Sequence, residues 1–165
     1  MSLGLAQAYC VQAYIGLGGN LAGAAGNAAD TVRWALAQLA NHPSMALLAQ
    51  SALYGSSPVD AGGADYVNAV ACVATDLAPL DLLHALQTLE NQAGRERPYR
   101  NAPRTLDLDL LLYGDCHMDS VELTIPHPRM AERAFVLQPL ADIAPHLVNP
   151  QALAHLRLSQ GIWPL

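Results

Sequence analysis

The order of the regular segments limits the fold of this 165-residue chain more than any other feature. Alternating or continuously apolar runs predict strands, and apolar residues three or four apart predict helices. Together they predict strand, helix, strand, strand, helix, strand, over residues of about 10–17, 27–41, 46–54, 66–75, 79–93 and 105–113. This order indicates an α+β sandwich of ferredoxin-like type, with helices covering one face of a mostly antiparallel sheet.

Local signals mark where these segments begin and end. Asn27, with Asp30 three residues later, predicts an N-cap for the first helix, and Gly94 is typical of the end of the second. Residues 55–63 are rich in Gly, Ser and Pro and predict a long loop. A short helix is expected around residues 130–137. With no repeat or linker, we expect one domain over residues 1–165, in which residues 1–11 form a flexible extension.

Composition and charge narrow the possible functions. Hydrophobic residues make up 52% of the chain and charged residues 13%, which argues against disorder. The formal net charge of −6 argues against a general binder of nucleic acid or anionic membranes. There is no lysine, yet six of the eight arginines lie between Arg95 and Arg133. That concentration indicates either a local site for an anionic ligand or a solvated basic loop.

Cysteine usage and the lack of long apolar runs predict the compartment. Cys10, Cys72 and Cys116 are odd in number and widely spaced, so neither a disulfide framework nor a zinc site is indicated. A signal peptide requires a positively charged start, but no lysine or arginine precedes Arg33. No apolar run is long enough to span a bilayer. We therefore expect a cytoplasmic protein with reduced thiols.

Asp107 and Asp109 are the most informative residues for chemistry. They alternate within the apolar run of residues 105–113, so both carboxylates project from one face of a strand. Adjacent like charges repel, and a hard divalent cation such as Mg²⁺ removes that conflict while sharing its remaining positions with phosphates and water. The alternative is a polar face that meets solvent. The continuous apolar character, typical of a central strand, and the flanking arginines favour the metal site.

Arginines supply planar groups that can hold phosphate oxygens in pairs. Four of them precede the aspartates and two follow, and His127 lies between two prolines in a stiff segment from which it could donate to a phosphate. The glycine-rich run 16–20 has the wrong spacing for a dinucleotide fingerprint, and a P-loop kinase is excluded because no lysine is present. The residues alone therefore indicate magnesium-dependent handling of a phosphorylated ligand.

Two weaker pairs lie on regular elements. Tyr66 and Asn68 alternate onto one strand face and together suit a flat heterocycle, although tyrosine in a strand commonly serves packing alone. Gln87 and Glu90 share one side of the second helix and by themselves are typical of solvated positions.

Several motifs, in order, resemble one known family. Residues 102–114, Ala-Pro-Arg-Thr-Leu-Asp-Leu-Asp-Leu-Leu-Leu-Tyr-Gly, closely resemble the signature of the hydroxymethyldihydropterin pyrophosphokinases. The segments 14–21, 51–68, 89–95 and 126–133 match the same family in register, and the resemblance spans about residues 12–148. It implies a ferredoxin-like fold and transfer of diphosphate from ATP to the hydroxymethyl group of 6-hydroxymethyl-7,8-dihydropterin, with release of AMP, in folate biosynthesis.

The resemblance also implies a role for each matching residue. Asp107 and Asp109 would bind two Mg²⁺ ions with ATP, and Asp109 is the nearest candidate to accept the hydroxyl proton. Arg95 and Arg104 would close over the substrates on mobile loops. ATP would be held by Gln87, Arg97, His127 and Arg133. The pterin edge would meet Ser56, Ser57, Val59 and Asn68, its ring would lie between Tyr66 and Phe135, and Glu90 would support the pocket.

The chain departs from the family pattern at three positions. Asn101 stands where a tryptophan is common, Pro98 where a basic residue is common, and Ala134 where a glycine is common. The change at Ala134 is small, and only the Asn101 and Pro98 departures keep open an inactive relative. The alternative from another functional class is a non-catalytic ferredoxin-like domain that binds a small ligand. We expect a monomer that acts on small molecules and binds neither nucleic acid nor membrane.

Overall fold

The computed structural model describes residues 11–58, 63–94 and 105–165. Its main sheet has six strands in the order β5-β1-β4-β3-β8, with β2 also paired to β4, and every pairing among these strands is antiparallel. The elements are β1 (Val11–Gly19), α2 (Ala28–Ala40), β2 (Met45–Gln50), β3 (Tyr54–Ser56), β4 (Tyr66–Thr75), α3 (Pro79–Gln92), β5 (Asp107–Tyr113), β6 (Met118–Asp119), β7 (Thr124–Ile125), η1 (Met130–Glu132), α4 (Ala134–Ile143), η2 (Pro145–Leu147), α5 (Pro150–Ser159) and β8 (Ile162–Pro164).

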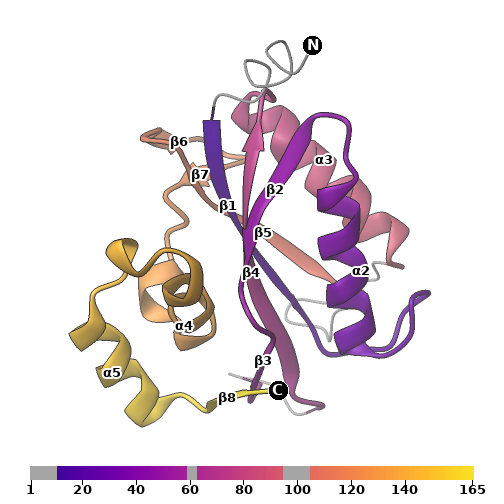
Figure 1. The fold of residues 1–165 in the computed structure, drawn as a ribbon. Coiled ribbons are helices and arrows are strands. Elements are labelled where there is room, and N and C mark those ends of the chain that lie inside the picture. Colours follow the sequence, from indigo (N-terminus) through magenta and orange to yellow (C-terminus); the bar gives the residue numbers. More distant parts are fainter. Residues whose placement is uncertain (1–10, 59–62, 95–104) are drawn as a thin grey trace.

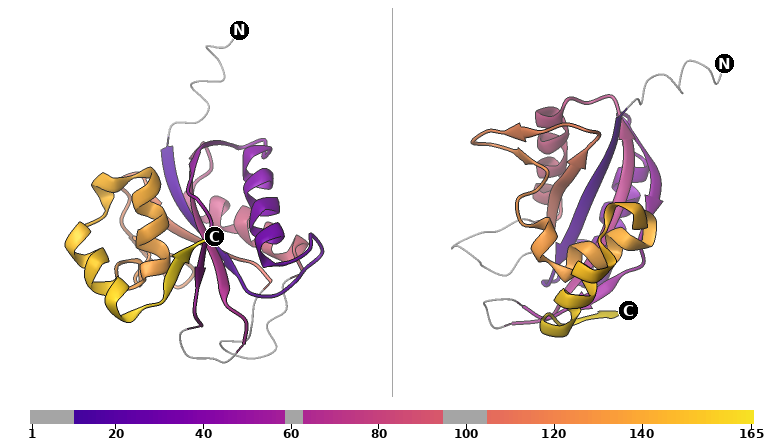
Figure 2. Two further views of the ribbon diagram at one scale, coloured as in Figure 1. Left: turned by 60° about the horizontal axis from the view of Figure 1, so that its bottom comes forward. Right: turned by 90° about the vertical axis from the view of Figure 1, so that its left-hand side faces the viewer.

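Helices cover both faces of the sheet. In Figure 1, α2 and α3 lie on one side of it and α4 and α5 on the other, and the views in Figure 2 agree. Leu108 and Leu110 of β5 belong to the core beneath α2 and α3, whereas Leu111 packs with Leu137 and Leu140 of α4. The ferredoxin-like α+β class is confirmed. The expectation that helices cover one face is wrong, because α4 and α5 form a second layer.

Most predicted elements are present, with local differences. Asn27 and Asp30 form the capping box, since each side chain accepts a hydrogen bond from the other's backbone N–H, at 2.8 and 3.1 Å. The strand expected over 46–54 is instead divided into β2 and β3. Ser51 interrupts it, because its hydroxyl oxygen accepts the N–H of Val70 at 2.9 Å in place of a ladder bond. The predicted loop 55–63 also begins inside β3.

The strand that carries the two aspartates is an edge strand, not the central one that its apolar character suggested. Its pairing with β1 has a bulge, in which Leu111 has no partner between the pairs Ile15–Leu110 and Tyr14–Leu112. The carbonyl of Leu111 accepts the backbone N–H of His127 at 2.9 Å. Both faces of β5 are covered by helices, which explains why this edge strand has the apolar composition of a buried central strand.

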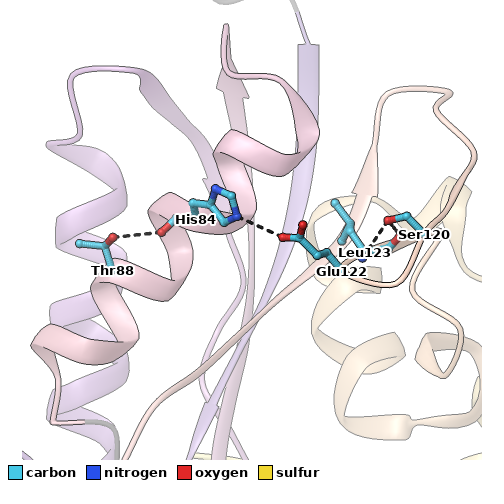
Figure 3. Close-up of polar contacts among 5 residues, drawn as sticks. All are labelled: His84, Thr88, Ser120, Glu122 and Leu123. Atoms are coloured by element: carbon cyan, nitrogen blue, oxygen red, sulfur yellow. Dashed lines mark hydrogen bonds and ion pairs between the residues drawn. The ribbon is translucent and has the colours of Figure 1, made fainter.

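A small hairpin, β6–β7, connects β5 to the segment that carries His127. Figure 3 shows its contact with α3, where the His84 ring approaches the Glu122 carboxylate at 3.3 Å. Both side chains are more than half exposed, so this pair contributes little to stability. Burial of Leu123 and Ile125 in the core beneath α3 holds the hairpin instead. Within the described part of the chain, none of the helices has the length and apolarity needed to cross a membrane.

Candidate functional site

Strand register brings the two aspartates and the candidate pterin groups onto one face of the sheet. Asp107 is paired with Gly18 of β1, and Gly18 is paired with Asn68 of β4. Directly paired residues of antiparallel strands project from the same face. Asn68, Gly18 and Asp107 therefore form a row across three strands, on the face that α4 covers farther along.

The centre of this row is bare backbone. A Cβ on Gly18 would lie 3.2 Å from the side-chain oxygen of Asn68, a tight contact. Two strand spacings separate β4 from β5, roughly 10 Å, so Gly18 leaves an open floor between the amide and the carboxylates. The strand predicted from the sequence ended near residue 17, and the run 16–20 was considered only as a dinucleotide fingerprint, so this role was missed. The usable signal was the alternation of Gly16 and Gly18 in a mostly apolar strand, which marks a close approach of another group.

Asn68 and Ser56 form a buried polar pair at one end of the row. Each is 3% exposed, and the Asn68 amide donates to the Ser56 hydroxyl at 2.7 Å. The register pairs Ser56 with Tyr66, so the half-buried tyrosine ring projects from the same face. Ser57 follows at an exposed position, and Val59 lies outside the described residues. A buried amide beside a tyrosine fits recognition of a flat, polar heterocycle.

Arg133 and Phe135, at the start of α4, lie close to the carboxylate end of the row. A guanidinium nitrogen of Arg133 is 4.0 Å from a carboxylate oxygen of Asp109. The guanidinium carbon lies 5.3 Å from the centre of the Phe135 ring, within range of a cation–π contact. Because the side chains of Arg133 and Asp109 are about one third exposed, at 27% and 34%, both remain accessible to a ligand.

His127 lies in the same neighbourhood and favours the neutral form. Burial lowers its pKa, the positive charge of Arg133 lowers it further, Asp107 opposes the shift and Arg129 adds to it. The Nδ1 atom accepts the backbone N–H of Arg129 at 3.2 Å, which assigns the proton of the neutral ring to Nε2. His127 can therefore donate one hydrogen bond from Nε2 to an anionic ligand.

We expect His127 to titrate below its ordinary pKa of about 6.5 in the protein without nucleotide or magnesium. Because the folded-state pKa is depressed, the corresponding stability is present above the unfolded value and is lost as the pH falls through the folded one. Arg133→Gln should raise the His127 pKa only part of the way back, since burial is the first cause. An imidazole NMR titration measures both, with Arg157→Gln as the control. A titration at or above 6.5 would contradict the burial of this ring.

Glu90 supports β5 from α3. It is 4% exposed, and its carboxylate accepts the backbone N–H of Leu108 at 2.9 Å. Leu108 lies between the two aspartates, so this bond fixes the edge strand where the carboxylates are presented. The view that Glu90 is an ordinary solvated residue is wrong, and its position fits the supporting role that the family resemblance implied.

Glu90→Ala should lower the free energy of unfolding by about 1–3 kcal/mol, because it leaves the buried N–H of Leu108 without this acceptor. Chemical denaturation measures the loss. Glu132→Ala, at an exposed position, is the matched control and should stay within about 0.5 kcal/mol of the parent protein. Equal stability of the two variants would remove Glu90 as the support of β5.

The remaining candidates divide into described and undescribed residues. Gln87 is half-buried on α3, three residues before Glu90. Arg95, Arg97 and Arg104 lie outside the described residues, as do Pro98 and Asn101. The structure therefore gathers Asp107, Asp109, His127 and Arg133 around the end of β5, and Ser56, Tyr66 and Asn68 across the glycine floor from them.

The donor set fits magnesium shared with phosphates. Over residues 11–58, 63–94 and 105–165, no three His, Cys, Asp or Glu side chains converge as a self-sufficient metal cage. What β5 offers is two half-buried carboxylates on one face. Mg²⁺ is commonly bound by one or two carboxylates, with substrate phosphates and water completing the octahedron.

The chain is similar to proteins of one known family. The family model "7,8-dihydro-6-hydroxymethylpterin-pyrophosphokinase (HPPK)" matches residues 14–145. The 2-amino-4-hydroxy-6-hydroxymethyldihydropteridine pyrophosphokinase of Pseudomonas aeruginosa is 48% identical over 83% of both chains. The Haemophilus influenzae protein of that name is 43% identical over 86% of this chain and 87% of its own.

Solved structures show the same fold in a longer protein. A crystal structure of a Plasmodium falciparum HPPK-DHPS triple mutant superposes with a TM-score of 0.62 at 15% identity, over 94% of this chain. This chain spans 45% of that one, so the likeness concerns part of a larger protein. On the matched model and the identity to curated relatives, the chain belongs to the 7,8-dihydro-6-hydroxymethylpterin-pyrophosphokinase family.

Proposed function

We propose that this chain transfers diphosphate from ATP to the hydroxymethyl group of 6-hydroxymethyl-7,8-dihydropterin and releases AMP. Family membership supports the reaction, and the row Asn68–Gly18–Asp107 is the observation that carries it. The row offers a buried amide for a heterocycle and carboxylates for a metal-bound polyphosphate, separated by roughly two strand spacings. That separation suits a bicyclic ring whose reactive alcohol points toward the carboxylates.

The pterin is held at the β4 end of the row. We assign its polar edge to Asn68, Ser56 and Ser57, with Val59 from the undescribed segment. The ring lies over the backbone of Gly18, between Tyr66 and Phe135. Because Asn68 and Ser56 are already bonded to each other and buried, they are preorganised and lose little side-chain entropy when the ligand binds.

The triphosphate is held at the β5 end. Two Mg²⁺ ions, bound by Asp107 and Asp109 together with ATP, would neutralise phosphate charge and align the groups for in-line displacement. Arg133 and the Nε2–H of His127 face the same anion, with Gln87 on α3. Arg97 extends this set from the undescribed segment. Planar guanidinium groups suit the charge that spreads over phosphate oxygens in the transition state.

The hydroxymethyl oxygen attacks the β-phosphorus, a new O–P bond forms, and the bond from the β-phosphorus to the oxygen shared with the α-phosphate breaks. AMP leaves with that oxygen. We assign acceptance of the hydroxyl proton to Asp109, which is paired with Gly16 and projects from the same face of β5 as Asp107. Arg95 and Arg104 would close over the substrates and exclude water. Most of the rate acceleration then comes from positioning and from charge stabilisation.

The test is AMP release from ATP and magnesium, with and without the pterin alcohol. Pterin-dependent AMP that disappears with chelator supports the reaction and its metal requirement. A folded protein that binds the pterin but releases no AMP is instead a binding module or an inactive relative. A monomer acting in the cytoplasm stays a prediction; sedimentation velocity tests the oligomeric state.

A further inference from the structure

Residues 160–165 contact two parts of the proposed site that are far apart in sequence. Their strand β8 pairs with β3, beside which it lies at the bottom of Figure 1. Gln160, just before β8, contacts the backbone on either side of Arg133. The short segment thus joins the strand that carries Ser56 to the start of α4, which carries Arg133 and Phe135.

The first contact extends the sheet beyond β3. Ser56 is paired with Ile162, the N–H of Ser57 donates to the carbonyl of Gly161 at 3.4 Å, and the N–H of Leu165 donates to the carbonyl of Leu53 at 3.1 Å. With only three residues, β3 makes few ladder bonds of its own to β4. Pairing on its second edge therefore fixes the position of Ser56 and Ser57.

Trp163 packs against β3 on the face opposite to Ser56. It is paired with Gly55, and a Cβ on Gly55 would overlap the indole ring, so the ring lies directly against the strand backbone. Gly55 alternates with Ser56, which places the indole on the face opposite to Ser56 and Asn68. A flat, half-buried ring pressed on glycine backbone leaves β3 little freedom to move away from the pterin face.

Gln160 makes the second contact with both ends of its side-chain amide. Its oxygen accepts the N–H of Ala134 at 2.8 Å, and its nitrogen donates to the carbonyl of Glu132 at 2.8 Å. Arg133 lies between these two residues. Gln160 is itself the C-cap of α5, where its backbone N–H donates to Leu156 at 2.8 Å. The amide therefore ties the Arg133 backbone to a helix end.

We propose that residues 160–165 form a clasp that sets the spacing between the pterin-edge groups on β3 and the Arg133–Phe135 segment, with Gln160 and Trp163 as positioning residues. This rests on the proposed function, in which the pterin lies between those two groups. Misplacing reacting groups by about 1 Å can cost on the order of 10²-fold in rate. A clasp that holds both sides of one ligand acts on substrate affinity, beyond the stability of the fold.

Two variants test the clasp through the KM of each substrate. Trp163→Ala loosens β3 alone and should raise the pterin KM about tenfold, while the ATP KM stays within about twofold. Gln160→Met keeps the side-chain length but removes both amide contacts, and should raise the KM of ATP and of the pterin. Gln151→Met, at an exposed position of α5 whose backbone alone is bonded, is the matched control.

A purely structural role predicts something different. Partial unfolding lowers apparent kcat in proportion to the folded fraction and leaves both KM values unchanged, and that result for Gln160→Met and Trp163→Ala would overturn the clasp. If Trp163→Ala does not fold, Gln160→Met decides alone, because it changes one side chain that bonds only to backbone. An unmodified protein without pterin-dependent AMP release would reject the proposed function itself, whereas an active one with unshifted variants rejects only the clasp.

Discussion

Asp109→Asn is expected to lower kcat for AMP release by at least about 10³-fold, or roughly 4 kcal/mol, while the protein stays folded. The amide keeps the size of the side chain but removes the negative charge that a metal-bound polyphosphate requires and the oxygen that we assign to proton acceptance. Asp109 also lies 4.0 Å from Arg133, so the substitution leaves that guanidinium without its anionic neighbour. The effect should therefore exceed the loss of one hydrogen bond.

The experiment compares Asp109→Asn with Asp119→Asn, which makes the same chemical change at an exposed position of β6. Rates are measured at saturating ATP, pterin and magnesium, and thermal unfolding confirms that both variants fold. Asp119→Asn should keep the parent rate. Activity of Asp109→Asn within tenfold of the parent would remove Asp109 from both of its assigned roles, and Asp107→Asn would then show whether one carboxylate suffices.

The two metal-binding candidates could be predicted from the sequence because residues two apart in a strand project from the same face. Asp107 and Asp109 share a face in any extended strand, and the structure confirms it. The spacing could not predict which residues of the neighbouring strands lie opposite the aspartates. The row through Gly18 to Asn68 depends on the register between β1, β4 and β5, which is set by long-range packing and by the bulge at Leu111.

The second helical layer could not be predicted for a related reason. A short helix was expected around residues 130–137, but the position of a helix in the sequence does not say which face of a sheet it covers. The bulge that leaves Leu111 unpaired places both Leu111 and Leu112 toward α4, and this departs from the strict alternation on which sequence reasoning relies. The continuous apolar character of residues 105–113 made β5 look central, whereas burial by helices on both faces gives an edge strand the same composition.

Asn68→Ala should raise the KM for the pterin by roughly 10²-fold, about 3 kcal/mol, with little change in the KM for ATP. Asn68 is 3% exposed and bonded to Ser56, so its loss removes a pterin contact and also frees the Ser56 hydroxyl from its fixed orientation. The ATP groups lie across the Gly18 floor and keep their positions. A site built to bond a polar ring edge discriminates strongly, because an unmatched buried group is costly.

Ser51→Ala is the matched control for this change. Ser51 is also buried, at 4% exposed, and its hydroxyl accepts the N–H of Val70 on the same strand β4 at 2.9 Å. Neither Ser51 nor Val70 is assigned a ligand contact. Both variants should lose comparable stability, on the order of 1–3 kcal/mol, because each removes a buried hydrogen bond on β4. Only Asn68→Ala should shift the pterin KM. Equal KM shifts in the two variants would mean that Asn68 acts through the fold of β4, and recognition of the ring would then pass to Ser56 and Tyr66.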